Sequence, residues 1–252
     1  MIGLGTYAFF WELRAGMSLI DAFTATREYG VDLFQICDHT PLEIMSDAEV
    51  RDAAAAAREL GVTIQLGTRG VDHAQLARFL DLARAFDATL VRSMTVDLAD
   101  APLRGILPAY EDAGVTLALE TYEQIATADL VALVERIGSP ALGICLDPAN
   151  VVARLESPRM CVERAAPHVR NVHVKDFAFA RQEGWVGFTY GGAPMGEGLH
   201  DYPHLLQTVR PRERGIDEIV EHWLSWQGDA TTTIRTEREW TRTTLDYLRS
   251  TL

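Results

Sequence analysis

Short apolar runs alternate with helix-like stretches along the whole chain, and this alternation constrains the fold more than any other feature. Eight runs rich in apolar or β-branched residues predict strands, and the stretches between them have the helical period. The predicted strands are residues 2–7, 32–37, 62–67, 89–94, 115–120, 142–147, 169–174 and 217–222. The predicted helices are residues 18–29, 46–60, 72–86, 101–113, 127–137 and 235–249.

Eight βα units in 252 residues predict an α/β protein with one domain, a (β/α)8 TIM barrel spanning residues 1–252. A doubly wound sheet is the competing architecture, but it usually has a glycine-rich phosphate turn after its first strand. Here the residues YAFFW follow the first strand instead. The glycine-rich stretch 177–200 predicts an elaborated loop after the seventh strand, and such long loops are usually functional.

Composition excludes several classes of protein. The 23 basic against 36 acidic residues give a net charge of −13, which argues against a nucleic-acid partner. The N-terminal stretch lacks the basic and apolar regions of a signal peptide, and no run of ~18 apolar residues predicts a membrane span, so a cytoplasmic protein is expected. Cys37, Cys145 and Cys161 have no disulfide or zinc spacing, and we expect buried thiols.

Acidic residues and one histidine stand at the ends of four consecutive predicted strands: Glu120, Asp147, His173 and Glu221. In a barrel, the C-terminal ends of the strands form the active site. Three carboxylates cannot share a small space without a cation, because they would raise one another's pKa. Each residue alone is more often structural, but the joint pattern predicts a site for a divalent ion such as Mn²⁺, Mg²⁺ or Co²⁺.

Further residues near the same rim suggest what the site binds. Lys175 lies two residues beyond His173, on the same side of the predicted strand, and could fix an anionic oxygen. Guanidinium groups bind carboxylates and phosphates bidentately, so arginines near the rim predict an anionic substrate. Tyr7 and Trp11 could form an apolar wall, although packing of the barrel mouth explains them equally well. The predicted substrate contacts are Asn150, Arg69, Arg92, Arg181, Tyr7 and Trp11.

Four short motifs resemble the xylose-isomerase-like TIM barrels of the sugar phosphate isomerase/epimerase family: ALE at 118–120, CLDPAN at 145–150, HVKD at 173–176 and Glu-His at 221–222. The resemblance implies that Glu120, Asp147, His173 and Glu221 hold one divalent metal, commonly Mn²⁺. It also implies that the two glutamates move protons on opposite faces of the substrate. Asn150 departs from the best-known epimerases, which have a histidine there, and this disfavours a tagatose-epimerase-like activity.

The resemblance implies an isomerase or epimerase that acts on a small keto sugar or sugar acid through a metal-stabilised enediolate. The alternative is a metal-dependent decarboxylase or other lyase of an oxidised sugar. The motifs TYAFFW, GTRG and DPAN resemble those of the family branch that includes 3-oxo-isoapionate decarboxylase. The metal-dependent subunits of C-glycoside deglycosidases also have this barrel. A DNA-repair nuclease would need more than the seven histidines present and a basic surface. A non-catalytic binding subunit is the remaining class. We expect a homo-oligomer, and the sequence is also compatible with a catalytic subunit that works with a different partner chain.

Overall fold

Eight parallel strands close into a barrel in the computed structural model, which describes residues 1–96 and 98–251. The strand order around the barrel is β1-β10-β7-β6-β5-β4-β3-β2. The strands are β1 (Ile2–Gly5), β2 (Leu33–Cys37), β3 (Thr63–Gly67), β4 (Leu90–Ser93), β5 (Thr116–Glu120), β6 (Leu142–Leu146), β7 (Val169–Val174) and β10 (Asp217–Val220). Each lies within one of the eight predicted runs, and the prediction of a (β/α)8 barrel is confirmed.

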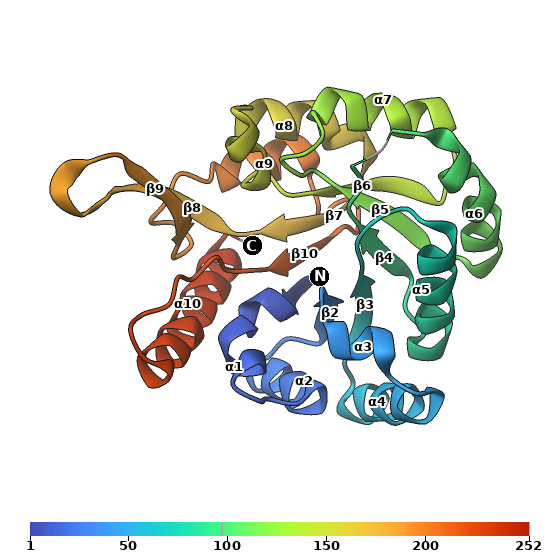
Figure 1. Cartoon of the computed structure of the whole chain (residues 1–252), viewed down its shortest axis with the longest axis horizontal. Helices are drawn as coiled ribbons and strands as arrows, with labels where there is room; N and C mark the ends of the chain where they lie inside the picture. Colours follow the sequence, from blue (N-terminus) through green and yellow to red (C-terminus); the bar gives the residue numbers. More distant parts are fainter. Residues whose placement is uncertain (97, 252) are drawn as a thin grey trace.

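Helices surround the barrel on its outside (Figure 1). The longer ones are α2 (Leu19–Glu28), α4 (Asp47–Leu60), α5 (His73–Phe86), α6 (Asp100–Ala113), α7 (Thr127–Ile137), α8 (Pro158–Ala165), α9 (Tyr202–Val209) and α10 (Ala230–Ser250). Short helices α1 (Phe10–Arg14) and α3 (Thr40–Ile44) follow β1 and β2. Among the described residues, no helix combines the length and the apolar character that a membrane span requires.

The ends of the helices follow from local sequence. Ser18 and Ser46 each form a capping box with the acidic residue three positions later, which satisfies two backbone amides at the start of α2 and α4. Gly61 ends α4 in the left-handed conformation that favours glycine. The last helix begins at Ala230 rather than near 235, because the Asp229 side chain accepts a hydrogen bond from the Thr232 amide and caps it there.

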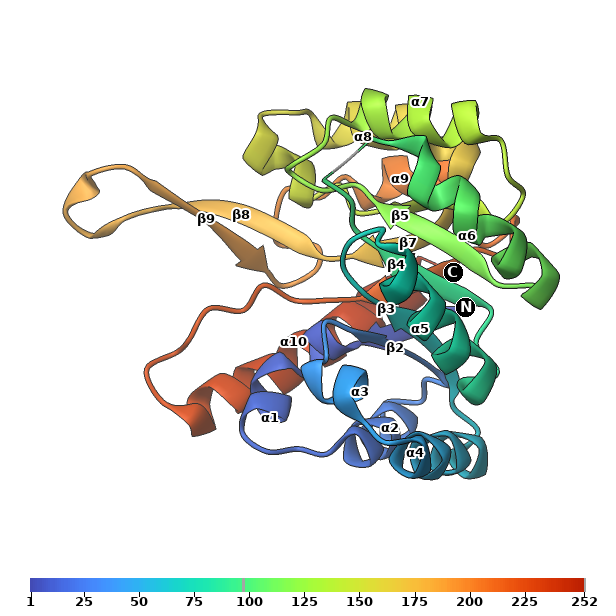
Figure 2. The same ribbon diagram turned by 45° about the vertical axis from the view of Figure 1, so that its right-hand side comes forward.

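The sequence predicts an elaborated loop in the glycine-rich stretch after β7, but the structure has an antiparallel hairpin there. Its strands β8 (Asp176–Arg181) and β9 (Phe188–Ala193) form a two-stranded sheet that is separate from the barrel. The hairpin projects away from the barrel in both ribbon views (Figure 1, Figure 2). The Asp176 carboxylate holds its base by accepting hydrogen bonds from the backbone amides of Phe177, Gly196, Gly198 and His200.

The close approach of β2 and β3 requires a glycine at position 67. Gly67 lies beside Cys37 in the parallel register, and a Cβ atom there would be 2.2 Å from Cys37 Sγ and 3.1 Å from Cys37 Cα. We therefore expect Gly67→Ala to lower the free energy of unfolding by about 1–3 kcal/mol through overpacking. Urea denaturation measures this loss. Gly191→Ala is the matched control because no atom lies within 4 Å of its added Cβ, and equal stability of the two variants would contradict the expectation.

Candidate metal and active site

The four residues predicted as metal ligands meet at the C-terminal end of the barrel. Glu120 ends β5, Asp147 follows β6, His173 lies in β7, and Glu221 follows β10. All four are at most 3 % exposed. His173 Nδ1 lies 3.4 Å from Glu120 Oε1, 3.4 Å from Glu221 Oε2 and 3.9 Å from Asp147 Oδ2. One imidazole nitrogen therefore faces three carboxylates.

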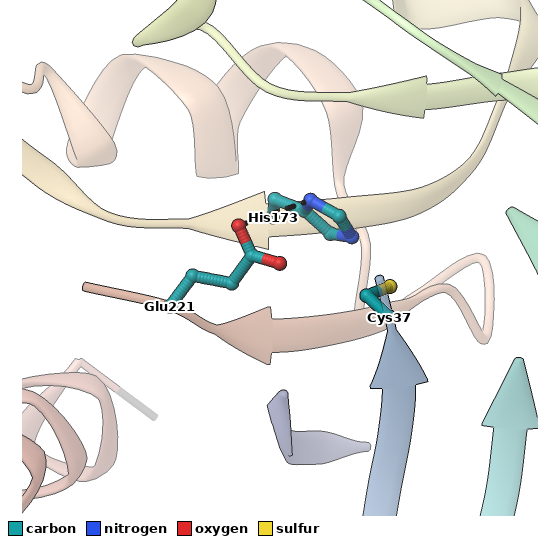
Figure 3. A group of neighbouring side chains, drawn as sticks. All are labelled: Cys37, His173 and Glu221. Atoms are coloured by element: carbon teal, nitrogen blue, oxygen red, sulfur yellow. Dashed lines mark ion pairs between the residues drawn. The ribbon is translucent and has the colours of Figure 1, made fainter. Parts of the chain in front are cut away.

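The second nitrogen of His173 is already occupied by a hydrogen bond. Nε2 lies 2.8 Å from Gln35 Oε1, a carbonyl oxygen that can only accept, so Nε2 carries the proton. The Cys37 thiol lies on this side of the ring, whereas the Glu221 carboxylate lies on the other (Figure 3). Cys37 Sγ also donates to Gln35 Oε1, at 3.0 Å. The thiol is thus a hydrogen-bond donor on the far side of the ring from the carboxylates.

These side chains fit a divalent ion. His173 Nδ1 is buried and has no hydrogen-bond partner among the described residues, and neither has Glu221 Oε1. The potential ligand atoms of Glu120, Asp147 and His173 all lie within 4.8 Å of one another. A divalent ion would be held by the carboxylate oxygens of Glu120, Asp147 and Glu221 and by His173 Nδ1, which has a free lone pair when the other nitrogen carries the proton. Three carboxylate oxygens and one imidazole suit Mg²⁺ or Mn²⁺.

Lys175 reaches into the same group of carboxylates. Its Nζ lies 2.6 Å from Asp147 Oδ2 and 3.0 Å from Glu221 Oε2, and 4.4 Å from the centre of the Trp223 ring. Burial lowers the pKa of Lys175, but these two carboxylates outweigh it and the pKa is raised. Lys175 is therefore a fixed positive charge. Lys175 is also the only lysine in the chain, which has 22 arginines. A single lysine among so many arginines is a further sequence indication that this position has a special role.

The carboxyl groups differ in how strongly they hold a proton. Burial raises the pKa of Glu120, but the charges of Arg92 and of His173, which is protonated when no metal is bound, lower it by more, to about 2. Burial raises the pKa of Asp147 to about 6 despite the opposing effect of Lys175. For Glu221, His173 and Lys175 outweigh burial and hold the pKa well below its ordinary value. Both glutamates are thus ionised at neutral pH, as metal ligands must be.

Glu120 is oriented by two predicted substrate contacts. Arg92 is buried, and its Nε lies 2.5 Å from Glu120 Oε2. Asn150 Nδ2 donates to Glu120 Oε1 at 2.8 Å and to the carbonyl oxygen of Thr121 at 3.2 Å. Both side chains therefore hold the Glu120 carboxylate in place, in addition to lining the cavity in front of it.

Asp38 follows β2 and organises the opposite wall of the site. Its carboxylate accepts two hydrogen bonds from Arg69, at 2.8 and 3.0 Å, and one from the Tyr7 hydroxyl, at 3.1 Å. Its backbone has φ of 50°, in the left-handed region that is strained for a residue other than glycine. From its position directly after a strand, the sequence allows Asp38 either to contact substrate or to cap the next segment, and in the structure it holds Arg69 and Tyr7.

A cavity of about 220 Å³ opens beside Glu120, Glu221 and Lys175. Its lining residues are Tyr7, Asp38, Arg69, Arg92, Met94, Glu120, Tyr122, Glu123, Asn150, Ala153, Lys175, Tyr190, Glu221 and Trp223. Four of the six predicted substrate contacts are in this lining: Asn150, Arg69, Arg92 and Tyr7. Tyr190 comes from the hairpin and Trp223 from the segment after β10, and sequence periodicity gave no signal for either.

Two predicted contacts lie away from the cavity lining. Arg181 is exposed at the end of β8, where its guanidinium lies over the rings of Phe188 and Trp185. A strand rises about 3.3 Å per residue, so β8 carries Arg181 about 17 Å beyond Asp176. The Trp11 indole donates a hydrogen bond to the carbonyl oxygen of Leu224 and packs against Trp226. It fastens α1 to the segment after β10.

The chain is similar in sequence to a characterised enzyme over almost its whole length. It is 50% identical, over 98% of its length and 94% of the relative's, to 3-oxo-isoapionate decarboxylase of Pectobacterium atrosepticum. It is 25% identical, over 73% of its length and 61% of the relative's, to the uncharacterised protein YihM of Escherichia coli.

Solved structures with low sequence identity share the fold. A D-psicose 3-epimerase of Clostridium cellulolyticum, solved with D-tagatose, superposes with a TM-score of 0.75 at 14% identity, covering 99% of this chain and 98% of the other. A protein of Mycobacterium smegmatis, solved with magnesium, superposes with a TM-score of 0.70 at 17% identity, covering 91% and 90%. The sequence of residues 23–250 matches the xylose isomerase-like TIM barrel family. The chain is therefore an enzyme that belongs to the xylose isomerase-like TIM barrel family.

Proposed function

We propose that the protein is a divalent-metal-dependent decarboxylase of a 3-oxo sugar acid. The observation that carries this proposal is the 50% identity, over nearly the full length of both chains, to 3-oxo-isoapionate decarboxylase. That relationship favours the decarboxylase alternative over the isomerase or epimerase that the sequence analysis placed first. The epimerases among the solved structures are too distant in sequence to support more than the fold.

The chemistry of the substrate matches the charges of the site. In a 3-oxo acid, the bond between the carboxyl carbon and its neighbour can break when the ketone accepts the electron pair. CO₂ leaves, an enolate forms, and the neighbouring carbon is then protonated to give a ketone. A divalent ion at the Glu120–Asp147–His173–Glu221 group would supply Lewis acidity toward the ketone oxygen.

The chain's own residues complete this arrangement. Lys175 presents a permanent ammonium group to the cavity, where it can donate a hydrogen bond to the oxygen that becomes negative. The low pKa values of Glu120 and Glu221 favour their role as ligands over a role as proton donors. Tyr190 and Trp223 form an aromatic wall, with ring centres 5.6 Å apart, that limits the access of water.

The test is to incubate the protein with 3-oxo-isoapionate and Mn²⁺ and to measure CO₂ release together with the NMR spectrum of the product. The proposal expects one CO₂ per substrate consumed and no turnover after treatment with EDTA. Conversion without loss of carbon would instead support isomerisation or epimerisation. Metal binding without any reaction of this substrate would overturn the decarboxylase proposal for 3-oxo-isoapionate.

Arg69 is proposed to bind the substrate's anionic group. Asp38 holds Nε and Nη2 of its guanidinium, and the side chain lines the cavity and is 61% exposed, so Nη1 is available to an anionic group there. A hydrogen bond to a charged group contributes about 1.5–3 kcal/mol, so we expect Arg69→Met to raise KM roughly 10- to 100-fold, with a smaller change in kcat. Steady-state kinetics measure both. Arg84→Met removes an arginine from a surface ion pair with Asp81 and serves as the control. A fall in kcat at constant KM would contradict this role.

A further inference from the structure

A chain of buried amide groups runs through the barrel interior from His173 to Asp217. Gln35 Oε1 accepts from His173 Nε2, and Gln35 Nε2 donates to Gln65 Oε1 at 3.0 Å. Gln65 Nε2 donates to Asp217 Oδ2 at 2.7 Å. Gln35 and Gln65 are at most 2% exposed. The chain thus links a metal-ligand histidine near the top of the barrel to a carboxylate at the start of β10.

The carboxylate end fixes the direction of every hydrogen bond in this chain. An ionised Asp217 can only accept, so Gln65 must turn its NH₂ group toward it. Gln65 Oε1 then points to Gln35, which must donate in turn. Gln35 Oε1 is left facing His173, and the imidazole must present a proton on Nε2. The direction follows from which of these groups can donate and which can accept.

The neighbouring side chains are consistent with this direction and with no other. Asn171 Nδ2 donates to Gln65 Oε1, at 3.2 Å, and to the carbonyl oxygen of Asp217, at 3.3 Å, and both are acceptors. Asn171 Oδ1 accepts the second proton of Gln35 Nε2 at 3.0 Å. The Cys37 thiol donates to Gln35 Oε1. Burial raises the pKa of Cys37, which keeps this thiol protonated and able to donate.

We propose that Asp217, acting through Gln65 and Gln35, sets the imidazole tautomer of His173 and thereby leaves Nδ1 free to bind a divalent ion. Asp217 and the two glutamines are positioning residues, because none of them touches the cavity. The inference rests on the proposed function only in requiring that an ion binds His173. A metal-ligand histidine commonly donates its other N–H to such a partner, and loss of that partner typically weakens metal binding 10- to 100-fold.

The variant Asp217→Asn removes the acceptor at the end of the chain while keeping the shape of the side chain. The other oxygen of Asp217 accepts from the Met1 amino group at 2.6 Å, and that group can only donate. The oxygen of an asparagine would therefore turn to Met1, and its NH₂ group to Gln65. Gln65 would have to flip to accept from this NH₂ group, and its own NH₂ group would then face that of Asn171, which the carbonyl oxygen of Asp217 keeps in place. In either orientation of Gln65 two donors face each other, so the support of Gln35 Oε1 against the Nε2–H of a metal-bound His173 is weakened and metal binding should fall.

The experiment measures Mn²⁺ affinity by calorimetry in the full-length protein. Asp217→Asn should weaken binding about tenfold or more relative to Asp32→Asn, which removes an exposed carboxylate that forms a surface ion pair with Arg27 at 4.0 Å. Gln65→Met, which interrupts the chain, should also weaken it and serves if Asp217→Asn does not fold. In Zn²⁺-loaded protein labelled with ¹⁵N-histidine, the slowly exchanging Nε2–H signal of His173 should be present in the wild type and lost in both chain variants.

The outcomes separate this inference from the proposed function. Wild-type affinity together with an unchanged Nε2–H signal in Asp217→Asn and Gln65→Met would overturn the inference and leave the decarboxylase proposal intact. A wild-type chain that binds neither Mn²⁺ nor Zn²⁺ would overturn both. Weakened binding in the two chain variants, with normal binding in Asp32→Asn, supports the tautomer relay whatever substrate the enzyme accepts.

Discussion

Replacing His173 with alanine is expected to abolish stoichiometric binding of a divalent ion. The wild-type chain should bind about one ion, held by Nδ1 of His173 and the three carboxylates around it. Removal of the only nitrogen ligand leaves carboxylates that Lys175 can pair with instead. We expect the affinity for Mn²⁺ to fall at least roughly a thousandfold, which corresponds to about 4 kcal/mol. Elemental analysis and calorimetry measure the content and the affinity.

The matched control for this prediction is His168→Ala. His168 precedes β7 and lies 3.0 Å from the exposed carboxylate of Glu135, so its loss removes an imidazole without touching the site. This variant should keep the wild-type metal content. If His173→Ala also retained one tightly bound ion, the assignment of the metal site would be wrong, and the proposed chemistry would lose its basis.

Replacing Lys175 with methionine is expected to lower kcat about 10²- to 10³-fold while leaving the ion bound. Removing one donor that stabilises a developing negative charge has this size of effect in other enzymes. Metal affinity should stay the same or increase, because the ammonium group competes with the ion for Asp147 and Glu221. The two variants His173→Ala and Lys175→Met should therefore change metal affinity differently while both lose CO₂ release.

Lys175→Arg supplies the comparison, since it keeps the charge but replaces a compact ammonium by a planar guanidinium. We expect partial activity only. Because Lys175 is the sole lysine, selective labelling with ¹⁵N-lysine yields a single side-chain signal that should shift when Mg²⁺ binds. A Lys175→Met enzyme with normal kcat would show that the ammonium group neutralises the carboxylates and has no part in the reaction.

The grouping of the four proposed metal ligands could be predicted from the sequence for a simple physical reason. Parallel strands deliver their C-terminal residues to one rim, so Glu120, Asp147, His173 and Glu221 needed only correct strand assignment to be grouped. The barrel strands are short and buried, and the helices between them are capped by local signals. Both features are encoded within a few residues, and the eight predicted strands agree with the structure.

What the sequence did not show depends on contacts between distant segments. Gln35, Gln65 and Asn171 are single polar residues inside apolar strands, and only the closed barrel shows that they meet. Asp38 gains its role from Arg69, which arrives from the next βα unit. Arg181 was expected near the substrate because it follows β7 closely in sequence, but an extended strand carries it outward. Within a projecting hairpin, closeness in sequence to a site residue does not predict closeness in space to the site.

The hairpin separates what must stay constant from what can change. Two hydrogen bonds fix its base to the barrel. The Tyr190 hydroxyl donates to the carbonyl oxygen of Ala149, and the Gly192 amide donates to the carbonyl oxygen of Trp223. Its tip is held by hydrogen bonds among its own residues, such as that from the Gln182 amide to the carbonyl oxygen of Gly187. Insertions or replacements between Gln182 and Gly187 would leave the proposed metal ligands undisturbed. The length and the surface residues of this hairpin can therefore change during evolution without changing the residues of the site.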